Sequence, residues 1–495
     1  MKITKLTSWI GATLWYSYLF YEQSAGINFL LFNSALLLLV FTLQPTLRRQ
    51  PAAVAIASGC LVTALNVAWH PTGAAIAMNV VSLAGLSGLS LQPKASLLVA
   101  WINVGYSLAA SFITRFFKRG SPAASKKGEE GTATSKKPSA APVVAGIALD
   151  KLMFRSVPWL VVGAFFFIYT QASPAFASLF SQFSLDFISL GWVVFTLLGS
   201  YLLLVFFYPV AIRRLVQRDL SSADELQRKR QKRYNTNPIG LRLEYRAAWL
   251  LFVLLNGLLW VFNAVDMFYL LTGRLPEGVT HSNFVHQGVN MLIVSVVLAI
   301  AVVMYFFRGN LNFLRNNQRL RVVAYVWIVQ NAVLIGTTAS KNFSYIGEFG
   351  LTYKRIGVYV YLILTLIGLI TTFIKVRDIK SNWFLLRKNA WLFYTVLIIF
   401  STVDWGRAIT RYNVQFLNVK AIDVDYLISL PATNLDLLQE GLSTYGLSAY
   451  QIGKLERRLT SFVERKDQEG WPSWNFAEYR VYQRVNSVAS LTPAH

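Results

Sequence analysis

Charge and sulfur are both scarce in this sequence. Charged residues make up 14% of its 495 residues, against about 25% in soluble proteins. Its single cysteine, Cys60, lies inside an apolar run and can form neither an internal disulfide nor a thiolate metal cluster. The histidines form no HExxH pattern, and a mixed metal site would need ligands at non-standard spacings, namely Asp266, His281, His286 and Glu348. We therefore expect no redox chemistry, no metal and no cofactor.

Motifs for nucleotide, acyl or nucleic-acid chemistry are absent as well. The sequence contains no GxxxxGK[ST] phosphate loop, no GxGxxG after a strand and no GxSxG elbow. It also lacks zinc-finger, RNP and helix-turn-helix patterns. Lys and Arg outnumber Asp and Glu by 47 to 23. We attribute this excess to cytoplasmic loops that contact anionic lipid, and we expect membrane lipids as partners and no nucleic acid.

Long hydrophobic runs dominate what is present. A bilayer core of about 30 Å needs about 20 apolar helical residues. Five runs of this kind occupy the second half, at 245–270, 286–307, 322–339, 356–374 and 389–406. Seven others precede them, at 8–21, 27–43, 52–69, 73–91, 96–117, 157–180 and 187–208. The sequence therefore predicts an all-α, polytopic transmembrane helical bundle of about 11–12 spans, with a small extramembrane tail at its C-terminus.

Composition divides the chain into six parts. Residues 118–150 are rich in lysine and poor in large apolar residues, which is typical of a disordered linker. Within the second basic segment, Ser222 and Glu225 form a capping pattern that predicts an amphipathic helix over 221–233. The expected parts are N-terminal membrane segments (1–117), a basic cytoplasmic linker (118–150), a membrane hairpin (151–212), a basic cytoplasmic segment (213–244), a five-span core (245–406) and an extracytoplasmic tail (407–495).

The basic segments also predict the topology. If 118–150 and 213–244 both lie in the cytoplasm, the hairpin between them satisfies the positive-inside rule. The five later spans then alternate and leave the C-terminus outside. The first five segments do not fit this count, because Lys2 and Lys5 favour the cytoplasm and so does the linker. Either one segment is re-entrant or interfacial, or the N-terminus is outside.

Polar groups at the predicted span ends form the candidate sites. Charged groups at membrane depth are costly and usually face protein or water. The topology brings one set to the outer face: Asp266, His286, Glu348, Arg355, Asp404 and Arg407. These residues form either a mouth for a ligand, an ion or a partner domain, or ion pairs that fix helix packing.

Two further sets lie within the spans and on the inner face. The intramembrane set is Asn256, Asn263 and Asn331. Asn256 and Asn263 share one helix face because they are seven residues apart, and they form either interhelical hydrogen bonds or a polar translocation path. The inner-face set is a basic loop: Arg308, Arg315, Arg319 and Arg321. This loop binds lipid headgroups, binds a cytoplasmic partner, or is a solvated loop without a ligand.

Ordered motifs in the second half resemble a known family. They read LLNGLLWVFNAVDMFYL at 254–270, FFRGNLNFLRNNQRLR at 306–321, YIGEFGLTYKRIGV at 345–358 and DWGRAITRYNV at 404–414. This pattern resembles the bacterial multi-pass membrane proteins of domain-of-unknown-function families 4153 and 4173. The resemblance covers the second half well, the first five segments loosely and the lysine-rich linker not at all. It implies an integral protein of the bacterial inner membrane and carries no catalytic assignment.

Three functional classes follow from these observations. The absence of catalytic motifs favours a non-enzymatic subunit, scaffold or sensor of a membrane complex, which predicts a stoichiometric protein partner. A transporter or channel for a small solute or lipid predicts a water-accessible path past Asn263, Asp266 and Asn331. A membrane enzyme acting on a lipid-linked substrate predicts that Asp266, His286 and Glu348 converge within hydrogen-bonding distance.

Overall fold

The described part of the chain is helical. The computed structural model describes residues 2–116, 162, 165, 169, 176, 189–228, 238–272, 281–314, 317–417, 422–441 and 447–491. Outside its helices and turns, these residues contain an isolated antiparallel bridge between Glu225 and Lys380. The predicted linker (118–150) and nearly all of the predicted span at 157–180 lie outside the described residues.

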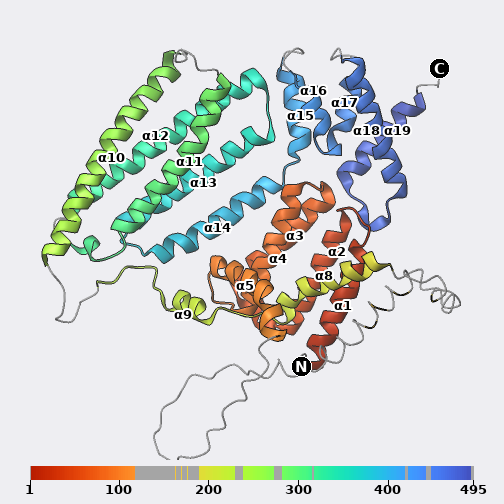
Figure 1. Ribbon diagram of the computed structural model, residues 1–495, viewed down its shortest axis with the longest axis horizontal. Helices are drawn as coiled ribbons and strands as arrows, with labels where there is room; N and C mark the ends of the chain where they lie inside the picture. The colour runs from red at the N-terminus through yellow and green to blue at the C-terminus, as the bar shows by residue number, and fades with distance from the viewer. Residues whose placement is uncertain are drawn as a thin grey trace, which may run out of the picture.

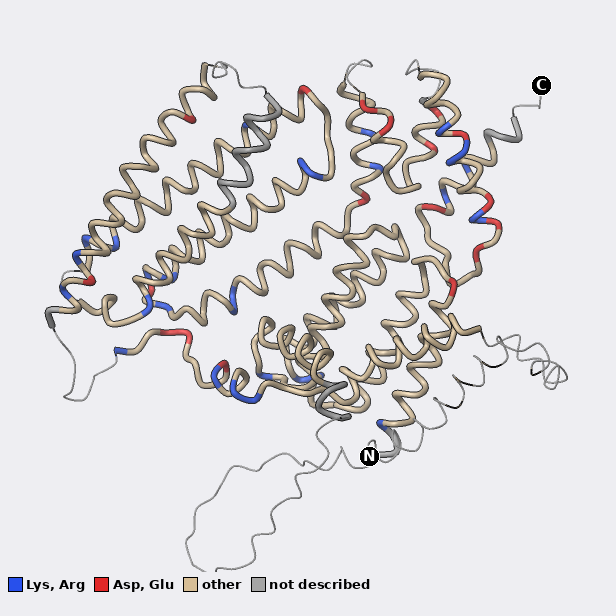
Figure 2. The backbone as a smooth tube through the Cα atoms, viewed as in Figure 1, with Lys and Arg blue, Asp and Glu red and all other residues tan. Residues whose placement is uncertain are grey.

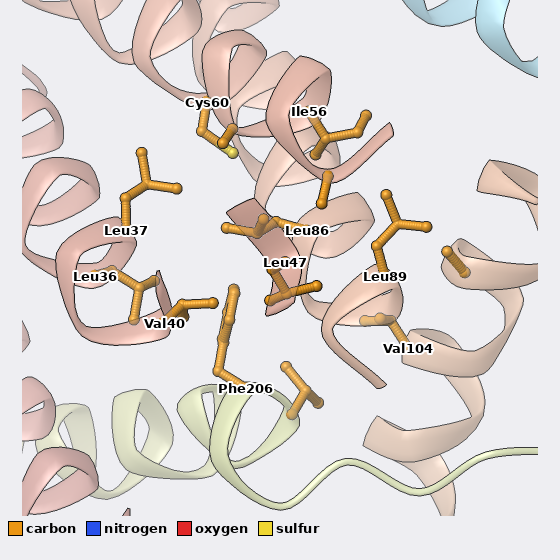
Figure 3. Close-up of a cluster of buried hydrophobic side chains, with 14 of the residues drawn as sticks. Leu36, Leu37, Val40, Leu47, Ile56, Cys60, Leu86, Leu89, Val104 and Phe206 are labelled. Atoms are coloured by element: carbon orange, nitrogen blue, oxygen red, sulfur yellow. The ribbon is translucent and has the colours of Figure 1, made fainter. Parts of the chain in front are cut away.

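The first group of helices forms an N-terminal bundle (Figure 1). Its helices match the predicted segments and are α1 (Lys2–Phe20), α2 (Ile27–Leu43), α3 (Pro51–Trp69), α4 (Gly73–Leu91), α5 (Leu97–Phe116) and α8 (Leu190–Phe207). A short turn, η1 (Pro45–Arg49), joins α2 to α3. Figure 3 shows the core of this bundle, where side chains of all these helices except α1 point toward one another, with Cys60 among them.

Polar side chains tie α1 to α8. Ser17 and Thr196 share a hydroxyl hydrogen bond of 2.7 Å, and Trp9 donates to the carbonyl oxygen of Ser200 at 3.1 Å. Tyr21 and Ser189 share another, at 2.6 Å. Trp9, Ser17 and Tyr21 are eight and four residues apart, so they lie near one face of the helix. Because their partners run in the opposite order, the two helices pack antiparallel.

The second group forms a bundle of long helices (Figure 1). It contains α10 (Pro238–Thr272), α11 (His281–Phe306), α12 (Gln318–Phe349) and α13 (Tyr353–Arg377), with the short η3 (Asn310–Phe313) after α11. We call it the second bundle. Its outward surface is apolar and exposed: Leu254 and Leu258 on α10 are 61% and 70% exposed. Such a surface suits surrounding lipid. A helix can face the hydrocarbon because its backbone groups are hydrogen-bonded within the helix.

Helix α14 (Asn382–Ser401) joins the two bundles. It packs against α13 on one side and against α3, α4 and α5 on the other. Tyr394 of α14 is buried in the N-terminal bundle and donates to Ser82 at 2.9 Å. Figure 1 shows α14 running from the base of the second bundle toward the top of α3. The two groups of spans are therefore held together by one shared helix.

The last residues fold into a C-terminal unit beside the ends of the spans (Figure 1). Its helices are α15 (Trp405–Phe416), α16 (Val424–Ser429), α17 (Leu435–Gly441), α18 (Ala449–Gln468) and α19 (Phe476–Leu491), with the short turns η5 (Ala432–Asn434) and η6 (Trp471–Ser473). A separate hydrophobic core holds it together and includes Leu427, Leu455 and Val481. The predicted small polar tail is thus a packed helical unit.

The prediction of an all-α polytopic membrane protein is confirmed. Among the described residues, seven helices are long and apolar enough to cross a membrane: α3, α4, α8, α10, α12, α13 and α14. Three shorter apolar stretches accompany them, at Ile27–Leu43, Leu97–Ala110 and Val294–Phe306. The total of about 11–12 spans and the orientation of the first five segments stay predictions.

The predicted helix over 221–233 is wrong for the residues that the structure describes. Helix α9 (Arg213–Ser221) ends where that helix was expected to begin. The next residues are extended, because they bond to the turn after α13: Ser381 donates to the carbonyl oxygen of Asp224, and Leu226 donates to that of Ile379. A salt bridge of 2.8 Å between Glu225 and Lys380 adds to this pairing. These tertiary contacts outweigh the local capping pattern.

Candidate functional site

Within the described residues, Asp266, Arg355 and Arg407 each bond to a partner outside the predicted outer-face set. Asp266 lies near the end of α10, is 7% exposed and forms a salt bridge with Lys341 of α12. Glu348 follows Lys341 by seven residues on the same helix, which is about 10 Å along its axis, and it is exposed. The side chain of His286 lies outside the described residues. The convergence that an enzyme requires is therefore not found between Asp266 and Glu348.

Arg355 binds the C-terminal carbonyl groups of α12. Its guanidinium donates to the carbonyl oxygens of Phe349 at 2.7 Å and of Gly350. The same group lies 4.3 Å from the ring centre of Tyr345. A cation at the carbonyl end of a helix interacts favourably with the helix dipole, so these contacts stabilise the turn between α12 and α13.

Asp404 and Arg407 are close together in the C-terminal unit. Asp404 caps α15 by accepting from the backbone N–H of Arg407, and it accepts from the Thr433 hydroxyl, both at 3.1 Å. Arg407 donates to both carboxylate oxygens of Asp436, at 2.6 and 2.9 Å. Arg484 donates to Asp436 at 3.0 Å from the other side. This network joins α15, η5, α17 and α19.

The intramembrane asparagines bind two helices together. Asn256 and Asn263 of α10 each donate to a backbone carbonyl oxygen of α12, that of Val323 and that of Gln330, both at 3.0 Å. Their seven-residue spacing is repeated on the partner helix, so the two bonds lie at matching levels. Asn331 is buried and donates within α12. These contacts are the interhelical hydrogen bonds that the sequence left as one alternative.

Acceptor oxygens along the same seam have no hydrogen-bond partner within the described residues. They are Oδ1 of Asn256 and Asn263, Oε1 of Gln330 and Oδ2 of Asp266. A buried polar atom without a hydrogen bond costs free energy. Water, which can donate hydrogen bonds, or a small cation, which oxygens can coordinate, would suit this row of oxygens.

A small hollow lies between α11, α12 and α13. It is lined mainly by apolar side chains, with Thr338, Tyr361 and Thr365 as the polar members: Val296, Leu334, Ile335, Thr338, Tyr361, Leu362 and Thr365. No group of three metal-ligating side chains occurs among the described residues.

The basic inner-face residues have separate environments. Arg308 lies 4.1 Å from the ring centre of Tyr305, and Arg321 donates to the carbonyl oxygen of Asn312 at 3.1 Å. Arg319 is exposed, and Arg315 lies outside the described residues. Figure 2 shows Lys and Arg gathered at the lower ends of the second bundle and along α9, opposite the C-terminal unit.

The C-terminal unit bonds to the N-terminal bundle through its η6 turn. Ile27 donates to the carbonyl oxygen of Trp474 at 2.8 Å, and Ser24 donates to the Ser473 hydroxyl at 2.9 Å. Gly26 is required at this contact, because a Cβ there would lie 2.4 Å from the carbonyl oxygen of Trp474. The α1–α2 turn and η6 are thus in backbone contact.

The C-terminal unit also bonds to the second bundle. Asn413 of α15 forms two hydrogen bonds with the backbone of Leu351, accepting at 2.6 Å and donating at 3.0 Å. The Tyr426 hydroxyl accepts from the backbone of Tyr353 at 2.9 Å. Leu351 lies in the turn between α12 and α13, and Tyr353 is the first residue of α13. One helical unit therefore contacts both groups of spans, at turns far apart in the sequence.

A family model matches residues 12–441 and is described as "Domain of unknown function (DUF4153)". The chain belongs to this family. The DUF4153 match extends from α1 to the end of α17, so it includes the N-terminal bundle, which the motifs indicated only loosely. No curated protein and no solved structure matches the chain. Membership of the DUF4153 family therefore assigns no activity.

The DUF4153 region also contains a joint that the sequence reading missed. Arg387 of α14 donates to the carboxylate of Asp219 at 3.1 Å and to that of Asp224 at 2.6 Å. Asp219 is 1% exposed and also accepts from the backbone of Ser96 at 2.6 Å. These contacts fasten α9 and the start of α5 to α14. No local pattern points to them, because the partners are 168 residues apart.

Replacing Arg387 should loosen this joint. Arg387→Ala leaves the buried Asp219 carboxylate without its cation, which typically costs about 3–5 kcal/mol. We expect a lower midpoint of thermal unfolding for the full chain in detergent and faster hydrogen exchange in α9. Lys388→Ala is the matched control, because Lys388 is exposed on the same helix. An equal effect of both variants would contradict a specific role for Arg387.

Proposed function

We propose that this protein is a non-enzymatic subunit, scaffold or sensor of a membrane complex. The observation that carries the proposal is the position of the C-terminal unit, which bonds to the α1–α2 turn of the N-terminal bundle and to the α12–α13 turn of the second bundle. A shift of one bundle against the other would have to strain or break one of these contacts. The unit is therefore suited to report such a shift to a protein bound outside the bilayer.

We further propose that the protein lies in the inner membrane of a bacterium, with the C-terminal unit on the extracytoplasmic side. The positive-inside rule supports this orientation. Helix α9, whose sequence includes Arg213, Arg214 and Arg218, lies at the end of the spans opposite the C-terminal unit (Figure 1). The linker 118–150, which is also lysine-rich, would then share the cytoplasm with α9.

The contacts of the candidate residues support a structural rather than a catalytic role. Arg355 and Arg407 are engaged by partners within the fold, and Oδ1 of Asp266 pairs with Lys341. A catalytic acid or base needs a free position within hydrogen-bonding distance of a substrate. Engaged side chains of this kind are better suited to hold helices in fixed relative positions.

Native mass spectrometry of the full chain, purified gently from its own membrane, tests the proposal. We expect a second protein at fixed stoichiometry. Gly26→Leu should reduce or abolish that association, because its side chain would collide with the backbone of Trp474 and push the C-terminal unit from the α1–α2 turn. Gly11→Leu is the matched control, because a Cβ at Gly11 meets nothing within 4 Å.

Two results would overturn the proposal. One is a preparation that contains no second protein but retains a stoichiometric lipid or small solute. The other is a co-purifying protein whose association is unchanged by Gly26→Leu, which would remove the C-terminal unit from the mechanism.

Transport of a small solute is the second candidate, favoured by the row of unpartnered acceptor oxygens between α10 and α12. Those oxygens suit a path for water or a small cation that ends at Asp266. This candidate requires the charge of Asp266 itself, whereas the first requires only that α10 and α12 stay together. Variants of Asp266 and Lys341 separate the two candidates, as set out in the Discussion.

A further inference from the structure

Exposed aromatic side chains gather where the C-terminal unit meets the N-terminal bundle. They belong to α1, α3, η6 and α19, and we call them the aromatic surface: Tyr18, Trp69, Trp471, Trp474 and Tyr479. Their exposed fractions run from 42% for Trp474 to 58% for Tyr18. On α18 the exposed side chains are largely charged or polar, apart from Tyr450 and Ile452.

Ring contacts cross between the two parts at two places, Tyr18–Trp471 and Trp69–Phe476. Tyr18 of α1 lies 6.4 Å from Trp471, measured between ring centres. Trp474 lies 6.1 Å from Tyr479, and Trp69 lies 4.4 Å from Phe476 at the start of α19. Side chains of spanning helices and of the C-terminal unit thus share one surface.

We propose that the aromatic surface binds the lipid headgroup region of the leaflet in which α3 ends. Trp69 is the last residue of α3, a helix long and apolar enough to cross the membrane. Trp and Tyr are enriched at this level of the bilayer, since their rings are apolar and their N–H or O–H groups remain hydrated. The Tyr18–Trp471 and Trp69–Phe476 contacts bring η6 and the start of α19 to the ends of α1 and α3, so the C-terminal unit lies against the bilayer.

The backbone of η6 fixes this arrangement. The Trp474 carbonyl oxygen accepts from Ile27, and the Ser473 hydroxyl donates to Oε1 of Gln23 at 2.8 Å. Trp471 and Trp474 are therefore held next to the first residue of α2. Arg480 lies 5.9 Å from the ring centre of Phe476 and supplies a cation at the level of the lipid phosphates. This inference holds whichever function the protein has.

Site-directed spin labelling tests the proposal. The full chain is labelled at Trp471→Cys and placed, one copy per disc, in nanodiscs of phosphatidylethanolamine and phosphatidylglycerol. The native Cys60 is buried and should take no label, which the unmodified chain checks. We expect the label at 471 to collide several-fold more with oxygen, relative to a water-soluble nickel chelate, than a label at Tyr450→Cys. Tyr450 is 67% exposed on α18, away from the aromatic surface.

Tyr479→Cys, on the same surface, is the second labelling site and keeps the test informative if the first variant fails to fold. Equal oxygen preference at the surface and at position 450 would overturn the proposal, because the unit would then stand in water. Dipolar coupling between labels on two copies, seen in larger discs, would overturn it as well and assign the surface to a second copy of the chain.

Discussion

Arg407→Ala is expected to destabilise the C-terminal unit by about 3–5 kcal/mol, the usual cost of removing one partner of a buried ion pair. Asp436 has only 1% of its side chain exposed, and Arg407 donates to both of its carboxylate oxygens. The Arg407 guanidinium also donates to the carbonyl oxygen of Thr433 at 2.8 Å. Its loss leaves a buried carboxylate with Arg484, whose side chain is 50% exposed, as its remaining ion-pair partner.

Hydrogen exchange of the full chain in detergent measures this effect locally. Amides of α17 and α19 should exchange faster in Arg407→Ala, while those of α3 and α4 stay protected. Arg484→Ala should have a much smaller effect, because exposed pairs contribute about 0–1 kcal/mol. Adding Asp436→Asn to Arg407→Ala should recover part of the loss, since no charge then stays buried. A double variant as unstable as Arg407→Ala would contradict the pairing.

The pH dependence of the same unit follows from Asp436. Burial raises the pKa of its carboxyl, but the hydrogen bonds and charge of Arg407, together with hydrogen bonds from the Leu437 backbone and Arg484, outweigh burial, so the pKa lies below its ordinary value of 3.8. A carboxyl whose pKa is lowered by folding stabilises the fold above its unfolded pKa and loses that contribution as the pH falls through the folded pKa. Without Arg407, burial should dominate and hold the folded pKa of this carboxyl above its unfolded value, so protonation would then favour the folded unit. The difference in unfolding free energy between the unmodified chain and Arg407→Ala should therefore narrow as the pH falls during acid titration.

Hydropathy predicted the spans well because the bilayer imposes a length on them. The predicted run at 27–43 coincides with α2, and those at 52–69 and 73–91 match α3 and α4 to within a residue. The ends of α12 were harder to predict. Its apolar run stops at 339, but the helix continues to Phe349. Backbone hydrogen bonds do not depend on side-chain polarity, so a helix can leave the apolar layer without a signal in its hydropathy.

The partner of Asp266 was not predicted because α12 extends beyond its apolar run. Lys341 lies just beyond the predicted span and was assigned to no candidate site, although it lies on α12 and faces α10. If residues 337–349 had been predicted as helical, Lys341 would have been placed on the same helix as Gln330. It follows Gln330 by eleven residues, which is about 16 Å along the helix axis. Combined with the asparagine contacts at matching levels, that reading could have paired α10 with α12.

Contacts between residues far apart in the sequence leave no comparable pattern in the sequence. Arg407 and Asp436 are 29 residues apart, and Arg387 and Asp219 are 168 apart. The sequence identified Arg407 as a candidate but not Asp436, because it contains no repeat or spacing that relates α15 to α17. Pairs of this kind are fixed by how whole helices pack, which depends on the sum of many contacts rather than on any local pattern.

Lys341→Ala is expected to destabilise the second bundle by roughly 3 kcal/mol, because it leaves Asp266 buried without a cation at the edge of the membrane. Asp266 is 7% exposed, and one of its oxygens has no other hydrogen-bond partner. The loss should appear as a lower thermal midpoint of the full chain and as faster exchange in α10. Lys354→Ala, at an exposed position of α13, is the control and should leave both unchanged.

The double variant Asp266→Asn with Lys341→Met separates the two candidate functions. Both charges are then absent, and helix packing no longer depends on a buried ion pair, so the thermal midpoint should return close to that of the unmodified chain. If the protein is a structural subunit, the co-purifying partner should return with it. If Asp266 ends a path for a cation, stability should return but cation uptake by vesicles containing the variant should not. A double variant as unstable as Lys341→Ala would contradict the ion pair itself.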